Sequence, residues 1–225
     1  MKNQKIDNIF NFKKKIILIT GSSGQLGKSF TKLFLDLGAI VFGFDKVPIR
    51  TSHPNFFFKS VDVSKKINVE KNISSIIKKN KKIDVIINNA AISVFSKFYN
   101  RTNSELDKTI NTNIKGTLNI INAYVKFHKL KKLKKCNIIN IGSIYGMMSP
   151  DFRIYGKKDK YNSEIYGATK ASIIQLTKYY SVILSKLNIN VNCLSPGGIY
   201  NEKKPQSSSF IKKYSLRVPK ARMAN

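Results

Sequence analysis

A tyrosine and a lysine four residues apart are the side chains of this sequence best suited to acid–base chemistry. Tyr166 and Lys170 stand near the start of a strongly helical stretch, so both side chains lie on one helical face. Because an ammonium group near a phenol favours the phenolate, we predict that the pKa of Tyr166 is lowered. Such a phenol can exchange a proton with a carbonyl or alcohol oxygen. The same pair also occurs by chance on exposed helices, so its weight depends on the residues around it.

Ser143 supplies that context. It follows an apolar run, residues 136–141, that is typical of a buried strand. In open α/β sheets, ligands bind beyond the carboxyl ends of the strands. A hydroxyl group at this position can donate a hydrogen bond to the reacting oxygen of a substrate. We therefore predict that Ser143, Tyr166 and Lys170 share one site, although Ser143 as a simple strand-end cap is the alternative.

A glycine-rich turn provides a second candidate site. Gly21, Gly24 and Gly27 follow the apolar run 16–20 and open a stretch, residues 28–37, with apolar residues at helical spacing. The unpaired backbone N–H groups and the positive end of a helix dipole at such a junction suit a dinucleotide pyrophosphate. The spacing G-x-x-G-x-x-G differs from the usual G-x-G-x-x-G fingerprint, and a plain structural turn is the alternative.

Asp45 ends the next strand-like run and suits the ribose of an adenosine. Its carboxylate can accept hydrogen bonds from both ribose hydroxyls and would repel a 2′-phosphate, which favours NAD over NADP. Lys46 and Arg50 lie nearby and can hold a phosphate instead, so NADP stays possible. A solvent-facing acid at the end of a strand is the alternative interpretation.

Strand-like and helix-like segments alternate along the chain, which predicts an α/β fold with a single doubly wound parallel sheet of about six strands. No linker divides the sequence, so residues 1–225 are expected to form a single domain with a sizeable core. The expected strands are 16–20, 39–45, 55–62, 83–88, 136–141 and 189–194, and the expected later helices are 67–79, 103–128 (broken only by Gly116) and 163–187.

The net charge of +29 on 225 residues raises the question of a nucleic-acid partner. The lysines, however, are spread through nearly every segment and do not form one basic stripe. We therefore predict no specific nucleic-acid function, with weak adhesion to polyanions as a general property. A catalytically weak protein that binds NAD or polyanions remains an alternative to an enzyme.

The remaining composition points to a cytoplasmic protein. Cys136 and Cys193 lie in apolar runs and are expected to be buried thiols of a reducing compartment. His53 and His128 are isolated, so no metal site is predicted. The charged N-terminus has no sustained apolar segment, which argues against a secretory signal and a membrane span.

Taken together, the motifs resemble those of the short-chain dehydrogenase/reductase family over roughly residues 13–225. The resemblance implies a Rossmann-type fold that binds NAD(P) and interconverts a carbonyl and a secondary alcohol by hydride transfer. The motifs, in order, are Thr20–Gly27, Asp62–Val63, Asn88–Ala91, Asn113–Gly116, Ser143, Tyr166–Lys170 and Ser195–Ile199.

The resemblance also implies roles for individual residues. Tyr166 is expected to be the general acid and base, Ser143 to steady the substrate oxygen, and Asn113 to anchor a water that relays protons through Lys170. Lys170 is expected to lower the pKa of Tyr166 and to hold the nicotinamide ribose. The implied cofactor-binding residues are Gly21, Ser23, Gly24, Leu26, Gly27, Asp45, Asp62 (adenine), Val63, Asn88 and Ala90 (adenosine ribose), Lys170, and Pro196 and Gly197 (nicotinamide).

Two features depart from the pattern of the smaller members of this family. The glycine spacing is typical of the extended branch, so a sugar-nucleotide epimerase or dehydratase is an alternative. Ser143 and Tyr166 are 23 residues apart, more than is usual, and the extra residues, 147–162, are expected to form a flap over the substrate. This flap resembles reductases of flagellin and surface-sugar modification and suggests a sugar-derived substrate.

The last residues, 217–225, resemble the segment that precedes the family's final helix and strand, so we expect a C-terminal truncation with the last strand missing. The family resemblance implies a homo-oligomer, a dimer or a tetramer, when the full-length chain is present. The substrate is expected to be a small carbonyl or alcohol compound. Its binding site is expected to be lined by residues 93–98, the flap and the segment after Gly198.

Overall fold

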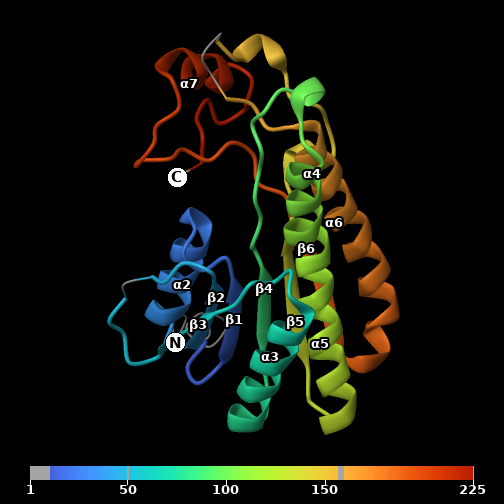
Figure 1. The fold of residues 1–225 in the computed structure, drawn as a ribbon. Helices are drawn as coiled ribbons and strands as arrows, with labels where there is room; N and C mark the ends of the chain where they lie inside the picture. The colour runs from blue at the N-terminus through green and yellow to red at the C-terminus, as the bar shows by residue number, and fades with distance from the viewer. Residues whose placement is uncertain (1–10, 50, 157–159, 225) are drawn as a thin grey trace.

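Six parallel strands form one sheet in the order β3-β2-β1-β4-β5-β6 (Figure 1). The computed structural model describes residues 11–49, 51–156 and 160–224. The predicted doubly wound α/β fold with six parallel strands is confirmed. The strands are β1 (Ile16–Thr20), β2 (Ile40–Asp45), β3 (Phe56–Ser60), β4 (Val85–Asn88), β5 (Cys136–Ile141) and β6 (Ile189–Leu194).

The chain changes direction across the sheet between β1 and β4. β1 pairs with β2 on one side and with β4 on the other, where Ile17 lies opposite Val85. The first half of the chain therefore builds the sheet toward β3, and the second half builds it toward β6. In such sheets the crevice beyond the carboxyl ends of the central strands is the usual ligand site.

β1 is apolar throughout because both faces of the sheet are covered. All five of its residues are buried. Ile16 and Leu18 pack with α3 (Lys66–Asn80) and α5 (Gly116–Lys131), whereas Ile17 and Ile19 pack with α2 (Gln25–Asp36). This alternation follows from the two-residue period of a strand. Figure 1 shows α2 on one side of the sheet and α3, α5 and α6 on the other.

The long helix that follows β4 is not broken at Gly116. It runs from α4 (Asn103–Ile110) through one π-helical turn (Asn111–Lys115) directly into α5. A Cβ atom on Gly116 would lie 2.6 Å from Cγ2 of Val63, so glycine permits close packing there and does not end the helix. The predicted break at this residue is therefore wrong.

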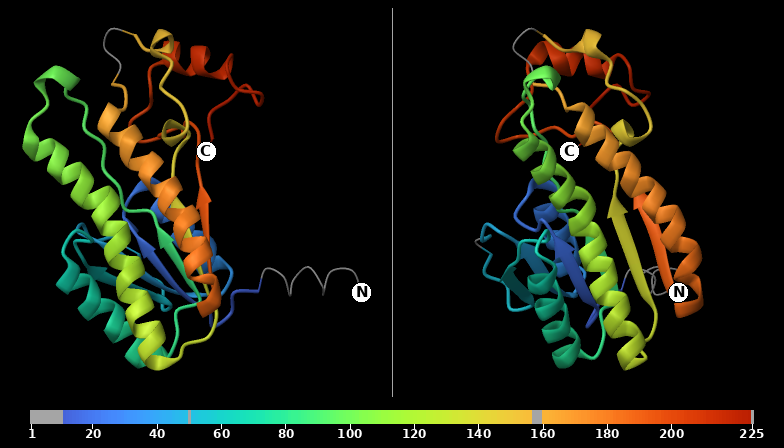
Figure 2. Two further views of the ribbon diagram at one scale, coloured as in Figure 1. Left: turned by 90° about the vertical axis from the view of Figure 1, so that its right-hand side faces the viewer. Right: turned by 45° about the vertical axis from the view of Figure 1, so that its right-hand side comes forward.

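The other long helix, α6 (Glu164–Ile183), is shorter than predicted and is followed by a 3₁₀ turn, Ser185–Leu187. α5 and α6 lie side by side in front of the sheet (Figure 2). β3 also ends earlier than predicted, because its last pair is formed with Asp45, where β2 ends. β4 starts later than predicted, since its pairing with β1 begins at Val85.

The last part of the described chain lies beyond the carboxyl ends of the strands (Figures 1 and 2). α7 (Ser208–Ser215) packs there on the 3₁₀ turn Phe152–Ile154 through a separate apolar cluster. Its buried members are Ile154, Phe210, Tyr214 and Met223. The segment that follows β6 therefore covers the end of the sheet where the sequence predicts the site.

The two cysteines differ in burial. Cys136 is buried and free, as predicted, but Cys193 is only half-buried and free. The prediction of two buried thiols is thus wrong for Cys193, which lies on β6 at the edge of the sheet, where only one neighbouring strand covers it.

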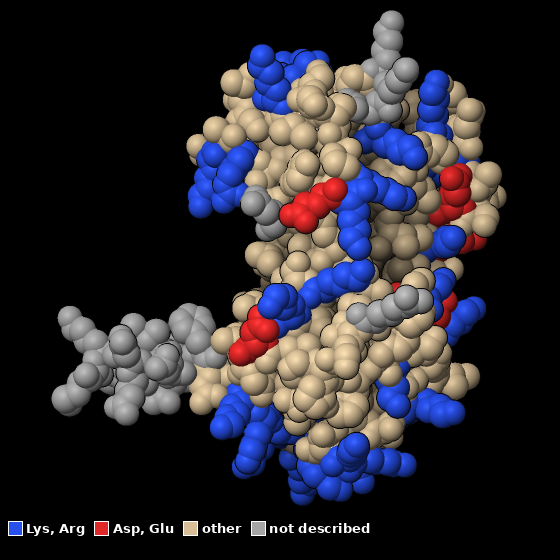
Figure 3. Space-filling model, turned by 90° about the vertical axis from the view of Figure 1, so that its left-hand side faces the viewer, with Lys and Arg blue, Asp and Glu red and all other residues tan. Residues whose placement is uncertain are grey.

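The basic residues do not gather in one place on the face seen in Figure 3. Lysine and arginine side chains are scattered over its upper, middle and lower parts, with a few acidic groups between them. Within the described parts of the chain, none of the helices combines the length and the apolar character needed to cross a bilayer.

Candidate active site

The glycine-rich turn connects β1 to α2 and approaches the backbone closely. Gly21 has a φ of +65°, a conformation that favours glycine, and its N–H donates to the carbonyl oxygen of Phe44 at 2.8 Å. A Cβ atom on Gly27 would collide with the carbonyl oxygen of Gly21. Gly24 caps α2 without a side-chain hydrogen bond, and the first turn of α2 contains no acidic residue. This helix end therefore suits an anion.

Asn89 and Thr20 hold this turn in place, and sequence reasoning gave neither of them a role. The side-chain Nδ2 of Asn89 donates to the carbonyl oxygens of Thr20 and Gly21, both at 3.0 Å. The hydroxyl oxygen of Thr20 accepts from the backbone N–H groups of Asn89 and Ala90, also at 3.0 Å. Four polar contacts thus fix the turn to the end of β4.

Asp45 lies at the end of β2 and faces the turn. Its Oδ2 accepts from the backbone N–H of Ser23 at 3.0 Å, and its Oδ1 accepts from that of Val47 at 3.1 Å. Next to it is a cavity of about 200 Å³ at the carboxyl ends of β1, β2 and β4. Five of the predicted cofactor-binding residues line this cavity: Gly21, Asp45, Asp62, Val63 and Ala90.

Asp62 is held as a carboxylate on one wall of the same cavity. Its Oδ1 accepts from the backbone N–H and the hydroxyl of Ser64, at 2.9 and 2.7 Å. Partial burial alone would raise its pKa, but the bonds from Ser64 and the nearby charges of Lys46 and Lys65 lower it overall. Lys46 is 3.7 Å from Oδ2 of Asp62 and also lines the cavity. Arg50, the other cation noted beside Asp45, lies outside the described residues.

The remaining predicted cofactor residues do not all point to this cavity. The side chain of Asn88 lies inside the sheet, where it donates to Oδ1 of Asn140 at 2.8 Å. Leu26 packs its side chain against the core on the α2 face. For Asn88 and Leu26, only the backbone is thus left to face a cofactor, and the asparagine that reaches the glycine turn is Asn89.

Pro196 and Gly197 follow β6 at the same edge of the sheet. The carbonyl oxygen of Pro196 accepts from the N–H of Ile144, directly after Ser143, at 3.1 Å. The phenol of Tyr214 on α7 lies against this turn and is bonded to the N–H of Gly198 at 2.6 Å. The turn that contains the predicted nicotinamide-side residues is therefore held by Ile144 at Pro196 and by α7 at Gly198, through contacts that no sequence motif indicated.

Ser143 and Tyr166 come together at the carboxyl edge. The side chain of Ser143 lies close enough to the phenol of Tyr166 to lower its pKa, although the two residues are 23 positions apart in the sequence. Burial raises the pKa of Tyr166, and the interaction with Ser143 only partly offsets this effect. The predicted lowering of this pKa is therefore wrong for the observed arrangement.

Lys170 explains the discrepancy. Its amine is buried, with 4% of the residue exposed, and Nζ donates to the carbonyl oxygen of Ile141 at 2.6 Å. Nζ lies 5.7 Å from the centre of the Tyr166 ring. Burial lowers the pKa of Lys170 to about 8. The predicted common helical face is present, but the amine makes its hydrogen bond to the end of β5.

Asn113 lies in the π-helical turn between α4 and α5. Its Oδ1 accepts from the N–H of Ile92 at 2.8 Å, and its Nδ2 donates to the carbonyl oxygen of Ile92 at 3.0 Å. Nδ2 also donates to the hydroxyl of Thr169 at 3.0 Å. Because both ends of the amide are used, the side chain joins the segment after β4 to helix α6.

The predicted flap, residues 147–162, is hydrogen-bonded to two neighbouring segments of the chain. The phenols of Tyr145 and Tyr155 are bonded to each other at 2.8 Å, and Ser93 donates to Oδ1 of Asn162 at 2.9 Å. These contacts tie the flap to the turn after β5 and to the segment after β4. Residues 157–159 of the predicted flap lie outside the described residues.

Comparison with known proteins gives the family. Residues 15–210 match the model of the short chain dehydrogenase family. An uncharacterized oxidoreductase of Schizosaccharomyces pombe is 33% identical over 187 residues, which cover 83% of this chain and 68% of that protein. A 3-oxoacyl-[acyl-carrier-protein] reductase of Thermotoga maritima is 29% identical over 209 residues, covering 86% of this chain and 79% of the reductase.

Solved structures agree with this result. A short chain dehydrogenase of Leptospira borgpetersenii with bound NAD⁺ superimposes with a TM-score of 0.89 at 35% identity, covering 98% of this chain and 83% of that one. Solved structures that share the fold carry NAD⁺ or NADP(H). The suggested relation to flagellin and surface-sugar modification gains no support from these proteins. The chain belongs to the short-chain dehydrogenase family and is an NAD(P)-dependent oxidoreductase.

Proposed function

We propose that this protein interconverts a carbonyl and a secondary alcohol, with Tyr166 as the general acid in reduction and the general base in oxidation. The observation that carries the proposal is the proximity of the Ser143 side chain to the Tyr166 phenol at the carboxyl edge of the sheet, which partly offsets the effect of burial on the pKa of the phenol. Because the Ser143 and Tyr166 hydroxyl groups lie close together, both can donate a hydrogen bond to the same substrate oxygen.

The residues around the glycine turn fit a nicotinamide dinucleotide. The close approach at Gly21 and Gly27, the uncapped end of α2 and the cavity beside Asp45 suit a pyrophosphate and an adenosine. Gly21, Ser23, Gly24 and Gly27 would hold the phosphates; Asp45, Asp62, Val63, Asn88 and Ala90 the adenosine; and Lys170, Pro196 and Gly197 the nicotinamide half. When bound, the cofactor supplies or accepts the hydride.

The protein supplies the proton and the position. A phenol with a raised pKa stays protonated at neutral pH, which suits donation from Tyr166 to a carbonyl oxygen. Ser143 steadies the same oxygen. Lys170 lies one helical turn further on, with an amine whose pKa of about 8 allows it to hold and release a proton near neutral pH. Asn113 would anchor, through its backbone, a water that relays protons to that amine, because its side-chain amide is already bonded to Ile92 and Thr169.

NAD is the proposed cofactor, with NADP as the alternative. Asp45 places a carboxylate beside the glycine turn, where it would accept from ribose hydroxyls and repel a 2′-phosphate. Lys46 is engaged with Asp62, which leaves its charge partly neutralised. Tighter binding of NADPH than of NADH would reverse this assignment.

The substrate that we propose is a small, polar carbonyl compound derived from a sugar. The polar groups of Ser93, Tyr145, Tyr155 and Asn162 on the flap and its neighbouring loop can hydrogen-bond a polyhydroxylated compound. The proposed setting is a homo-oligomer, a dimer or a tetramer, in the cytoplasm.

The test is a reductase assay of the purified protein with keto-sugars, acyl-thioester ketones and simple ketones, each with NADH and NADPH. Oxidation of the cofactor that depends on one class of ketone is the expected result. Tight binding of NADH without turnover of any class would instead support a catalytically weak NAD-binding protein.

A further inference from the structure

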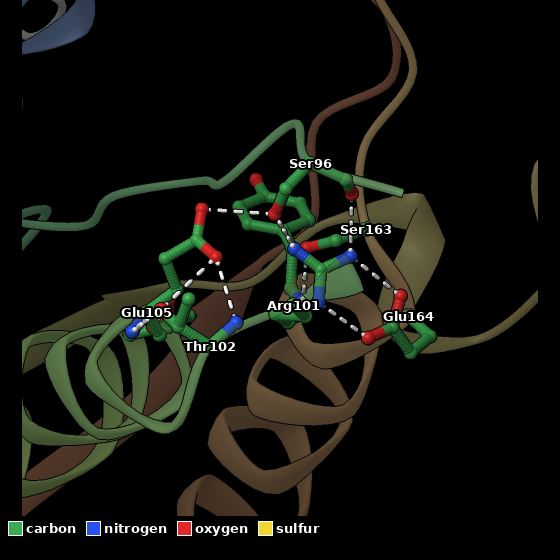
Figure 4. A network of polar contacts seen from close by, with 8 residues as sticks. Ser96, Arg101, Thr102, Glu105, Ser163 and Glu164 are labelled. Atoms are coloured by element: carbon green, nitrogen blue, oxygen red, sulfur yellow. Dashed lines mark hydrogen bonds and ion pairs between the residues drawn. The ribbon is translucent and has the colours of Figure 1, made fainter. Parts of the chain in front are cut away.

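Arg101 joins two segments of the site through a guanidinium group that is almost completely buried. It lies between β4 and α4, and only 3% of its side chain is exposed, against 57% for the side chain of its partner Glu164. Long charged side chains are rarely buried to this extent unless all of their donors are satisfied. Figure 4 shows the network that surrounds this group.

On one side, the guanidinium holds the start of α6. Nε donates to Oε1 of Glu164 at 2.7 Å, and Nη2 donates to Oε2 at 2.9 Å, which makes the pair bidentate. Paired charge-assisted bonds of this type fix the relative orientation of the two groups as well as their distance.

On the other side, the guanidinium holds the substrate-side loop, which we define as residues 93–98. Nη1 donates to the hydroxyl of Ser96 at 2.9 Å, and Nη2 donates to the carbonyl oxygen of Ser96 at 2.9 Å. Ser96 in turn donates to Glu105, whose other carboxylate oxygen accepts from the N–H of Thr102 at the start of α4. The loop is thus tied to two helix ends at once.

The proposed proton donor lies in the segment that Arg101 holds. Glu164 is the first residue of α6, and Tyr166 follows two residues later in the first helical turn. N–H groups of a first turn have no helical partners, and helix ends are the parts that open most readily. The Ser163 hydroxyl caps the N–H of Tyr166 at 3.3 Å, and the Arg101–Glu164 pair adds the only ion pair at this helix end among the described residues.

We propose that Arg101 is a positioning residue for Tyr166: through Glu164 and Ser96 it holds the first turn of α6 and the substrate-side loop in one fixed relation. This inference rests on the proposed function, because it assigns Arg101 to the placement of the proposed proton donor. The alternative is an ion pair that only adds stability to the fold.

The test compares Arg101→Met, Arg101→Lys and Glu164→Gln with controls from a second inter-helix ion pair. Lys126 on α5 and Glu70 on α3 form that pair at 3.3 Å, so Lys126→Met and Glu70→Gln are the matched controls. For Arg101→Met we expect kcat to fall about 10- to 100-fold, because small misplacements of reacting groups have effects of this order. The Kd for NADH is expected to stay within about twofold, and the controls are expected to keep the kcat of the wild type.

The exchange variant Arg101→Glu/Glu164→Arg restores an ion pair with reversed charges and is expected to recover part of the lost kcat. Such a recovery is not expected if Arg101 and Glu164 act independently of each other. Arg101→Lys keeps the charge without the bidentate geometry and is expected to fall between the wild type and Arg101→Met. Equal kcat values in the wild type, Arg101→Met and Glu164→Gln would overturn the proposal.

A readout without turnover separates this inference from the proposed function. In protein labelled with 3-fluorotyrosine, the ¹⁹F resonance that disappears in Tyr166→Phe reports on the phenol. We expect this resonance, and its titration with pH, to change in Arg101→Met and Glu164→Gln but not in Glu70→Gln. An unchanged Tyr166 resonance would refute the positioning role, whether or not the wild type reduces a ketone. Failure of the wild type to reduce any ketone would count against the proposed function alone. If Arg101→Met fails to fold, Glu164→Gln and Arg101→Lys decide.

Discussion

Replacing Lys170 by methionine tests the buried amine quantitatively. Burial lowers the pKa of Lys170 from its usual 10.5 to about 8. Each pKa unit corresponds to about 1.4 kcal/mol, so keeping this amine charged in the folded protein costs about 3 kcal/mol of stability. Loss of the hydrogen bond to the carbonyl oxygen of Ile141 offsets about 1–3 kcal/mol of this gain in the variant.

The pH dependence of the effect follows from the direction of the shift. Below about pH 8 the amine is charged in both the folded and the unfolded protein, so the wild type bears the whole penalty. As the pH rises from about 8 toward 10.5, the folded protein loses the proton while the unfolded chain still holds it, and the stability of the wild type rises. The difference in unfolding free energy, Lys170→Met minus wild type, should therefore fall by about 3 kcal/mol between pH 7 and pH 11.

The measurement is urea unfolding followed by circular dichroism at several pH values, because the sequence contains no tryptophan for fluorescence. Lys178→Met is the matched control, since Lys178 lies on the exposed side of the same helix. We expect the difference between this control and the wild type to change little with pH. A pH-independent difference for Lys170→Met as well would refute the argument that burial penalises this charge.

Three further predictions concern the turn, the cofactor and the charge. Gly27→Ala should lower the free energy of unfolding by about 2–3 kcal/mol and weaken NADH binding, because the new Cβ collides with the carbonyl oxygen of Gly21. In Gly24→Ala the new Cβ lies 3.3 Å from the same oxygen, so this variant should change the unfolding free energy and the Kd for NADH much less. Urea unfolding and fluorescence titration measure the two quantities. Asp45→Ala should weaken NADH binding about tenfold and reduce the discrimination against NADPH in the same titration. An unchanged ratio of the Kd values for NADH and NADPH would show that Asp45 does not contact the ribose. Binding of duplex DNA should be weak and lost at physiological salt in a filter-binding assay, whereas salt-resistant, sequence-dependent binding would establish the nucleic-acid function that the scattered lysines argue against.

The architecture could be predicted from the sequence because its signals are local. The run Ile16–Thr20 is buried throughout and the run Cys136–Ile141 mostly so, and segments with helical spacing separate such runs, so the order of strands and helices followed directly. The end of β3 could not be predicted from its own residues, because it depends on where β2 ends. Gly116 was misjudged for a similar reason: its role is contact with Val63, more than 50 residues away in the sequence.

The parts of the site that escaped prediction depend on directions of side chains. The motif Asn88–Ala91 indicates the cofactor end of β4, but only the structure shows that Asn88 points into the sheet and Asn89 to the turn. The pKa of Tyr166 was predicted from helical spacing alone, which contains no information on burial. Arg101 gave no signal, since its partners Ser96 and Glu164 are defined by the fold and by no motif.

The central claim is that Tyr166 donates the proton to a substrate oxygen that Ser143 also contacts. The most direct measurement is the single-turnover rate of ketone reduction by NADH-loaded Tyr166→Phe, with the Kd for NADH measured on the same protein. We predict that the rate falls at least about 100-fold, within the range for loss of a general acid, while NADH binding stays within about twofold. A Tyr166→Phe protein that reduces the ketone as fast as the wild type would contradict the claim.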